Sequence, residues 1–406
     1  MRGTTSANIG GTSPPGSRKG GAVLTEELPR FARPESVEEL SEIMSNAHRD
    51  GHSVAVYGGG TALDDHPPGE TPGLLIDMSG LNRVIEHSPG DLILVAEAGA
   101  TIAALKDVAE TGAQELLSDF PADRVDSGST LGGAIATRAV GPRRIGRLPL
   151  REVVLGVTVV LADGTIAKAG GKVVKNVAGY DLSKLMTGSW GTLGIIASAA
   201  IRLYPKPETQ GYVEIPGAEA ALGVLGSQIA PAAVEIDRSP GAESTTVVMV
   251  EGLPESVESR TRQIIAAYPG AKAGIEPSWW ARRAQAPVTI RASVSPALVP
   301  ELVAQIARLE DAIGYPIQLR GSAMGVFDLG VGAPDMDPAI ATRVVLEHLR
   351  TWDRRQLIAT LLCAPPAVWN EIDAWGEIPG FALMATIKDQ FDPNGLLSPG
   401  RGIGGL

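Results

Sequence analysis

A glycine-rich segment at residues 172–196 constrains the fold of this chain more than any other part of its sequence. It reads KVVKNVAGYDLSKLMTGSWGTLGII: a polar turn with a tyrosine, a short run with helical spacing, and three glycines in seven positions. Because glycine has no side chain, Gly188, Gly191 and Gly194 allow a flat or charged ligand to approach the main chain. Glycines at this spacing are also typical of a turn-rich connection between a helix and a strand.

A second glycine cluster ends a predicted buried strand upstream. The sequence SVAVYGGGTAL, residues 53–63, places Gly58, Gly59 and Gly60 directly after the strand, and Thr61 adds a hydroxyl group. Successive N–H groups in such a loop can point at a diphosphate. The loop has neither the G-x-G-x-x-G spacing of a dinucleotide fold nor the lysine of a P-loop. We therefore predict an anion cradle of another type.

A third cluster lies between the first two. The sequence DSGSTLGGAIAT, residues 126–137, is a hydroxyl-rich turn followed by paired glycines that open a helix of small residues. A phosphate or a ribityl chain can pack against such a turn.

Taken in order, these segments resemble the vanillyl-alcohol-oxidase (PCMH) type FAD-binding family. The resemblance covers about residues 30–206, and the terminal FDPNGLLSPGR, residues 391–401, resembles the segment by which that family closes over the flavin. Within the family, the short chain and the wording of residues 172–196 are most similar to the FAD-binding E subunit of bacterial glycolate oxidases. The resemblance implies an α+β fold, a two-lobed PCMH-type FAD-binding domain followed by an antiparallel-sheet α+β cap domain.

The resemblance also implies that FAD is bound non-covalently. Members that link the flavin use a histidine at the end of the glycine loop, where this chain has Thr61. The closing segment differs from the sequence that is common in the family at Ser398 and Arg401. The cofactor-binding residues that the resemblance implies are Tyr57, Gly58, Gly59, Gly60, Thr61, Ala62, Pro121, Gly128, Thr130, Leu131, Gly132, Gly133, Ala136, Thr137, Gly146, Asn176, Gly191, Gly194, Ile195 and Ile196.

Composition and the positions of proline residues divide the chain into four parts. Residues 1–21 are small, polar and helix-breaking types, which predict a flexible tail. We expect the FAD-binding domain at 22–206, with residues 34–94 as its first lobe. A proline-flanked connection then leads to a cap of ferredoxin-like repeats at 207–375, with helices on one face of its sheet, and 376–406 returns to the flavin domain.

Charge and apolar patterning narrow the class of partner. A net charge of −11 argues against nucleic-acid binding and provides no basic patch for anionic lipid. The chain lacks a secretory-type apolar segment and a long apolar run, which favours a cytoplasmic protein that reaches the inner membrane only through partners. Cys363 is the only cysteine, so a buried thiol is expected, and a Cys-ligated iron–sulfur cluster within this chain is excluded.

The sequence leaves the catalytic residues unknown. Relatives of the catalytic glycolate oxidase and D-lactate dehydrogenase type carry a His-rich metal motif, which has no counterpart here, because only His348 lies beyond the flavin domain; no metal site is predicted. Arg291 and Arg320 are the remaining candidates for substrate contact, since an arginine fork suits a carboxylate. Strand alternation leaves open that each of them faces solvent.

Two functions from different classes stay open. In one, the chain is a companion FAD-binding subunit of a glycolate oxidase-type 2-hydroxyacid dehydrogenase complex, with a related catalytic flavoprotein and an iron–sulfur subunit as partners. In the other, it is a stand-alone FAD-dependent dehydrogenase of glycolate or D-lactate. The missing histidines favour the companion subunit. A flavin-free assembly subunit is a third alternative, against which the permissive glycine loops argue.

Overall fold

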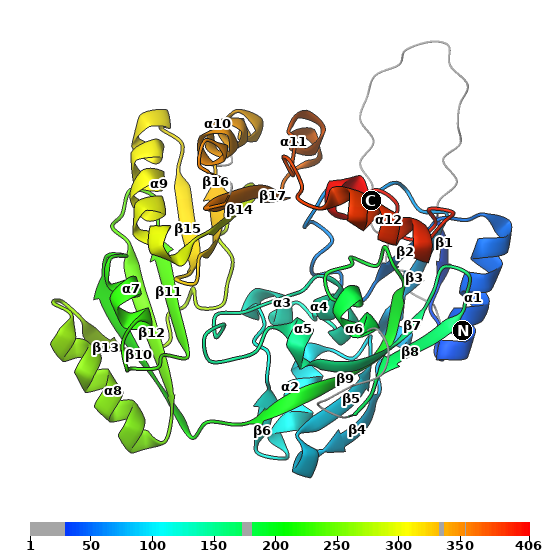
Figure 1. The fold of residues 1–406 in the computed structure, drawn as a ribbon, viewed down its shortest axis with the longest axis horizontal. Coiled ribbons are helices and arrows are strands. Elements are labelled where there is room, and N and C mark those ends of the chain that lie inside the picture. The colour runs from blue at the N-terminus through cyan, green and yellow to red at the C-terminus, as the bar shows by residue number, and fades with distance from the viewer. Residues whose placement is uncertain (1–28, 173–180, 333–336, 354) are drawn as a thin grey trace, which may run out of the picture.

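A computed structural model describes residues 29–172, 181–332, 337–353 and 355–406, so the tail expected at residues 1–21 lies outside the described residues. Two units of different architecture lie side by side (Figure 1). The link between them is short, because strand β9 (Ile195–Pro205) ends the first and strand β10 (Thr209–Pro216) begins the second. Both units are α+β, as predicted.

A small parallel sheet opens the first unit, with the strand order β1-β3-β2. Its elements are β1 (Arg30–Ala32), α1 (Val37–Asp50), β2 (Val54–Tyr57) and β3 (Leu74–Asp77). Helix α1 begins where the Ser36 hydroxyl accepts a hydrogen bond from the Glu39 N–H, and it ends at Gly51, which has a φ of 69°. Leu40 and Met44 on one face of α1 are fully buried, which fixes the helix against the sheet.

A larger antiparallel sheet forms the rest of the first unit. Its strands are β4 (Val84–Ser88), β5 (Ile93–Glu97), β6 (Gln114–Leu116), β7 (Val154–Val160), β8 (Ile166–Gly170) and β9; the helices are α2 (Ile102–Glu110), α3 (Ala122–Asp126), α4 (Leu131–Ala136), α5 (Leu150–Val153) and α6 (Leu182–Met186). The order is β4-β5-β9-β7-β8, with β6 also paired to β9. The predicted extent of the first lobe, residues 34–94, is therefore wrong at its end, because β4 and β5 join the sheet of β9.

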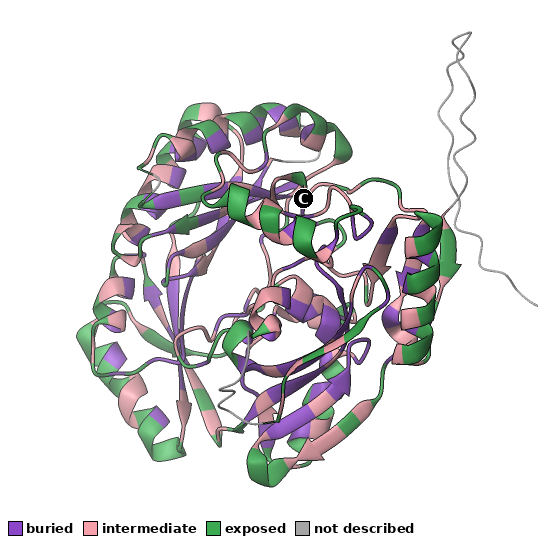
Figure 2. Ribbon diagram, turned by 45° about the vertical axis from the view of Figure 1, so that its right-hand side comes forward, coloured by how far each residue is buried: buried purple, intermediate pink, exposed green. Residues whose placement is uncertain are grey.

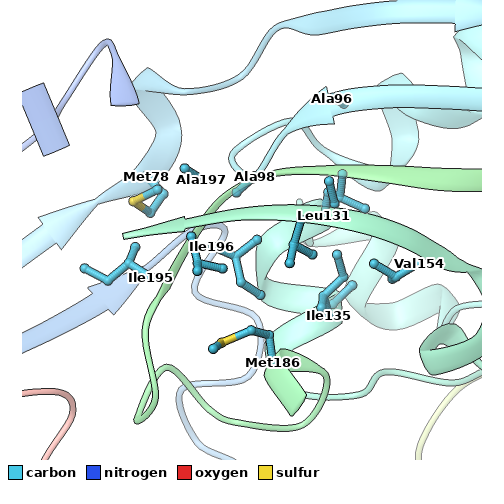
Figure 3. Close-up of a cluster of buried hydrophobic side chains, with 14 of the residues drawn as sticks. Met78, Ala96, Ala98, Leu131, Ile135, Val154, Met186, Ile195, Ile196 and Ala197 are labelled. Carbon is cyan, nitrogen blue, oxygen red and sulfur yellow. The ribbon is translucent and has the colours of Figure 1, made fainter. Parts of the chain in front are cut away.

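The core of the first unit lies between α4 and β9. Helix α4 directs Leu131 and Ile135 into a buried cluster with Val154, Met186 and Ile196 (Figure 3). Burying a side chain of this size stabilises a fold by about 1.5–3 kcal/mol. The start of α4 is thus held firmly against β9, the strand that follows Gly188, Gly191 and Gly194.

The second unit is an eight-stranded antiparallel sheet, which we call the cap. It repeats a βαββαβ pattern twice: β10, α7 (Ala220–Leu225), β11 (Ala233–Arg238), β12 (Thr245–Gly252), α8 (Pro254–Ala267) and β13 (Lys272–Gly274), then β14 (Val288–Val294), α9 (Val299–Ile313), β15 (Ile317–Ser322), β16 (Val326–Val331), α10 (Pro338–Arg350) and β17 (Leu357–Cys363). The strand order is β13-β10-β12-β11-β15-β16-β14-β17.

All four cap helices cover the same face of this sheet, as predicted (Figure 1). Apolar side chains of both the helices and the strands fill the space between them, and the outer surfaces of the helices are exposed (Figure 2). Because side chains alternate along a strand, the opposite face of the cap sheet is left to meet the first unit.

The C-terminal segment returns to the first unit after α11 (Pro366–Glu371) and α12 (Phe381–Phe391). Val54 at the start of β2 donates its N–H to the Leu396 carbonyl at 2.7 Å and accepts from the Ser398 N–H at 2.7 Å. Buried Lys388 on α12 donates from Nζ to the carbonyls of Thr192 and Leu397, each at 2.9 Å. None of the described helices combines the length and the apolarity needed to cross a membrane.

Candidate active site

The glycine-rich segments meet around one cavity of about 340 Å³ in the first unit, which we call the first cavity. The loop after β2, the start of α4 and the segment leading into β9 surround it, and residues 398–401 close one side. Of the residues predicted to bind the cofactor, its wall includes Tyr57, Gly58, Gly59, Gly60, Thr61, Ala62, Thr130, Gly132, Gly133, Ala136, Thr137, Gly191, Gly194, Ile195 and Ile196.

Glycine is required in the loop after β2 because this loop lies directly against the turn before α4. A Cβ atom on Gly58 would lie 2.2 Å from the Thr130 Oγ1 atom, and one on Gly59 would lie 1.9 Å from the Gly128 carbonyl oxygen. Gly60 adopts a φ of 70°, which other residues rarely adopt. The two glycine segments are therefore in backbone contact, and main-chain atoms form this part of the cavity wall.

The same loop presents unpaired donors to the first cavity. The backbone N–H groups from Gly58 to Ala62 donate no hydrogen bond to any described residue. Gly59 is exposed and its four neighbours in the run are half-buried, so these free donors are accessible to an acceptor from outside the chain. Consecutive N–H groups of this kind form a concave site for anions such as a diphosphate.

Arg401 ties the C-terminal segment to the end of the glycine loop. Its Nη2 atom donates to the carbonyl oxygens of Ala62 at 3.0 Å and Leu63 at 2.7 Å. The guanidinium also lies 5.8 Å from the ring centre of Trp190. Arg401, one of the two positions where the closing segment differs from the common family sequence, thus helps to order the cavity wall.

Four predicted cofactor residues that the structure describes lie outside the wall of the first cavity. Pro121 lines a second cavity, described below. Gly128 contacts the glycine loop through its carbonyl, Leu131 is fully buried in the core, and the Gly146 N–H donates to the carbonyl of Ala232 in the cap at 3.1 Å. Asn176 lies outside the described residues. For Leu131 the reason is helical geometry, since α4 turns this side chain into the buried hydrophobic cluster (Figure 3).

Trp190 stands between the first cavity and a second one. It adopts a positive φ of 55°. Its backbone N–H donates to the Ala136 carbonyl at 3.0 Å, and the Gly188 backbone N–H donates to the Ile135 carbonyl at 3.0 Å. The Ala136 carbonyl at the end of α4 thereby gains a partner, and the Ile135 carbonyl, which also accepts from the Arg138 N–H at 3.1 Å, gains a second donor. Trp190 and Thr137 line both cavities, so the two cavities adjoin.

His66 completes this aromatic wall. Its ring stacks on Trp190 with centroids 3.8 Å apart and lies perpendicular to the Trp375 ring with centroids 4.6 Å apart. Burial lowers the pKa of His66 to about 3, so the imidazole is neutral at physiological pH. The backbone N–H of His66 donates to the Leu362 carbonyl of β17 at 2.7 Å. Next to it, the half-buried Cys363 forms an isolated antiparallel β-bridge with Asp65. The thiol is thus less buried than predicted.

The second cavity, of about 570 Å³, lies between the first unit and the helix-free face of the cap sheet. Residues paired across neighbouring strands share a face of the sheet. One such row crosses five strands in the order Asp237, Arg320, Asp328, Arg291 and Thr360. The adjacent row on the same face is Glu235, Ser322, Val326, Ser293 and Ile358. A polar floor therefore faces the first unit.

Arg291 and Arg320 both line this second cavity, but their guanidinium groups already have partners. Arg291 binds both carboxylate oxygens of Asp328, at 2.8 and 2.9 Å, and Arg320 donates to Asp237 at 2.7 Å. Burial alone would raise the pKa of Asp328, yet the Arg291 charge outweighs it and holds this pKa below its usual range. The forks predicted for a substrate carboxylate are thus occupied by aspartates of the chain.

Two arginines that the sequence did not single out are less engaged. Arg144 donates from Nε to the Gly141 carbonyl at 3.1 Å and forms no ion pair with a described residue. The backbone N–H of Arg138 donates to the Ile135 carbonyl at 3.1 Å, but its guanidinium makes no hydrogen bond or ion pair with the described part of the chain. In total, seven arginines and four carboxylates line the second cavity. The excess of positive charge suits a small anion.

No three His, Cys, Asp or Glu side chains among the residues that the structure describes are grouped so that they could share a metal ion.

Comparison with known proteins identifies the first unit. Residues 29–170 match the family model described as "FAD binding domain". The glycolate oxidase subunit GlcD of Bacillus subtilis (strain 168) is 31% identical over 239 residues, 56% of this chain and 49% of that protein. The glycolate oxidase subunit GlcE of Escherichia coli (strain K12) is 33% identical over 135 residues, 33% of this chain and 38% of that protein. The chain therefore spans half or less of these relatives.

The fold of the whole chain has solved counterparts. The crystal structure of p-cresol methylhydroxylase with substrate bound superposes with a TM-score of 0.68 over 92% of this chain and 88% of that one, at 16% identity. This likeness concerns the fold alone.

The first cavity fits FAD on its own chemistry. Free N–H groups from Gly58 to Ala62 suit a diphosphate, and the apolar side chains of Met78, Ile195 and Ile196 in the wall suit a flat ring system. These residues would hold the cofactor, and its reactive ring supplies a two-electron acceptor.

Proposed function

Because residues 29–170 form an FAD-binding domain of the PCMH type, we propose that this chain oxidises a small 2-hydroxy acid in the second cavity, with FAD in the first. The observation that carries the proposal is the contact between the two cavities at Thr137 and Trp190, together with the excess of arginine in the second. A carboxylate is attracted to such a site. The likeness to glycolate oxidase subunits supports the same substrate class.

The residues of the second cavity have separable roles in this proposal. Arg138 and Arg144 have donors that are free to hold the substrate carboxylate. Trp190 and His66 form a stacked aromatic wall beside the flavin position, and a neutral His66 adds no charge there. Bound FAD would supply the acceptor for a hydride from C2 of the acid, and the residues of the chain have to orient C2 and to accept the hydroxyl proton.

The proposal predicts that the isolated, FAD-loaded chain is reduced by its substrate. Addition of glycolate or D-lactate without oxygen is expected to bleach the visible flavin absorbance, while acetate, which lacks the hydroxyl group, is expected to leave it unchanged. We also propose non-covalent attachment, so acid precipitation should release intact FAD, identified by its mass. A spectrum that neither hydroxy acid alters would contradict intrinsic oxidation by this chain.

A second candidate function is that of a companion subunit, and the similarity to GlcE of Escherichia coli favours it. In that role the chain would hold FAD for electron transfer within a complex that also contains a related catalytic flavoprotein and an iron–sulfur subunit. The complex would be cytoplasmic and would reach the inner membrane through these partners. A single cysteine gives this chain no thiolate set for a cluster of its own.

Co-expression separates the two candidates. The companion role predicts that co-expression with a related flavoprotein and a Cys-rich iron–sulfur protein yields one co-purifying assembly, which oxidises glycolate or D-lactate. It also predicts that neither hydroxy acid bleaches the flavin absorbance of the isolated chain. Full turnover with an electron acceptor by the isolated chain would rule out dependence on partners.

A further inference from the structure

Glu235 on β11 is a buried carboxyl group that the chain leaves without a full set of partners. It is 7% exposed, it lines the second cavity, and its Oε1 atom has no hydrogen-bond partner. It lies on the cavity face of the cap sheet, opposite Ser322 of β15. A buried acceptor without a donor is costly, so a ligand that supplies an O–H group to this wall would relieve that cost.

The surroundings of Glu235 set its protonation near neutral pH. Burial raises the pKa of Glu235 to about 8, and the charge of Arg144 and a hydrogen bond with the Ser322 side chain oppose this rise. Two further carboxylates act on it from neighbouring elements, Asp119 from the loop after β6 and Asp328 from β16, and both favour the protonated form. Glu235 therefore gains and loses a proton in the range where a general base is effective.

The other carboxylates and the histidine of the cavity are less suited to accept the proton. Glu377 is exposed, so water already solvates its carboxylate. Asp65 is ion-paired with both Arg124 and Arg283, and Asp328 is held by two hydrogen bonds from Arg291. Burial lowers the pKa of His66 to about 3, which makes its imidazole a weak base. Glu235 forms no ion pair with a described residue.

We infer that Glu235 accepts the hydroxyl proton of a hydroxy acid in the second cavity, and that Arg144 beside it holds the substrate carboxylate. The inference rests on the proposed function. The O–H bond of the acid breaks and its proton moves to the Glu235 carboxylate, the C2–H bond breaks with loss of a hydride, and C2 and oxygen form the carbonyl of a 2-oxo acid. FAD in the first cavity would supply the two-electron acceptor for that hydride.

The first test measures anaerobic flavin reduction against pH in the FAD-loaded protein. The wild-type rate should rise with pH and level off near the pKa of Glu235, about 8. Glu235→Gln keeps the size of the side chain and should lower the rate by about 10²–10⁴-fold, the usual worth of a general base, and should abolish this pH dependence. Glu235→Asp should restore part of the rate.

A matched control makes the same chemical change on the same sheet. Glu214 lies on β10, away from the cavity, and pairs with Lys272 at 3.0 Å. Glu214→Gln should keep the wild-type rate and pH profile. The visible spectrum of bound FAD shows whether each variant is folded and loaded.

The second test needs no turnover and uses oxalate, a dianion without a hydroxyl proton. Its binding is followed by the shift of the flavin spectrum. In the wild type, oxalate should bind several-fold more weakly above pH 8 than below it, because an ionised Glu235 then repels it. In Glu235→Gln, affinity should change little with pH.

The outcomes separate the two claims. Wild-type reduction with a Glu235→Gln rate within threefold of it, or an oxalate affinity with the same pH dependence in both proteins, would overturn the role of Glu235 alone. A wild-type flavin that no hydroxy acid reduces, although oxalate binds, would overturn the proposed oxidation, and the role of Glu235 with it.

Discussion

Replacing Gly59 with alanine is expected to weaken FAD binding by about 100-fold. The added Cβ atom would lie 1.9 Å from the Gly128 carbonyl oxygen and 2.7 Å from its carbon, and both atoms belong to the backbone. No rotamer change relieves such a contact, so the loop after β2 has to move away from the turn before α4. Overpacking of this kind costs about 1–3 kcal/mol, and each 1.4 kcal/mol is a factor of ten in affinity.

Titration of the apoprotein with FAD, followed by quenching of flavin fluorescence, measures this loss. Gly90→Ala is the matched control, because a Cβ atom there meets nothing within 4 Å, and Gly90 does not have a positive φ. Gly90→Ala should bind FAD like the wild type. If Gly59→Ala also did so, the free N–H groups from Gly58 to Ala62 would not be the diphosphate site. A larger residue, as in Gly59→Val, should have at least the same effect.

The first cavity could be predicted because each of its parts is a short, continuous segment. The glycine loop follows β2 directly, and Thr130 both caps α4 and contacts Gly58, so local sequence already determines the backbone shapes that form the wall. Prediction is less accurate inside α4. The family motif implies that Leu131 contacts the cofactor, but helical geometry turns its side chain into the core. A motif identifies the segment, whereas the turn of the helix decides which atoms reach the ligand.

The second cavity could not be assembled from the sequence for a different reason. Its floor requires five strands in register, and pairings such as Arg320 with Asp237 and Arg291 with Asp328 join residues far apart in the chain. Alternation shows that Arg291 lies on one face of a strand but not which face meets the first unit. The same limit explains the error in the first lobe, since β5 pairs with the distant strand β9.

A buried network of charged groups joins the two units beside this cavity. Arg143 contacts Glu115 at 3.0 Å, Asp119 at 3.3 Å and Glu251 at 3.4 Å, and Arg147 contacts both Glu115 and Glu251. Glu251 belongs to β12 of the cap, and the other four residues belong to the first unit. Two arginines thus compensate three carboxylates, which leaves the network with an excess of one negative charge.

Arg147→Met should destabilise the protein by about 3–5 kcal/mol, the usual cost of removing one partner from a buried ion pair. The Arg147 side chain is 3% exposed, and without its charge Arg143 alone faces three carboxylates, two of which lose a direct partner. Because Glu251 is the member contributed by the cap, the repulsion acts between the units, and unfolding in urea should divide into two transitions. Arg262→Met is the control, since Arg262 pairs with Glu258 on the exposed surface of α8, and such a pair contributes about 0.5 kcal/mol or less. A single transition with wild-type stability in Arg147→Met would mean that apolar packing, not this network, holds the cap against the first unit.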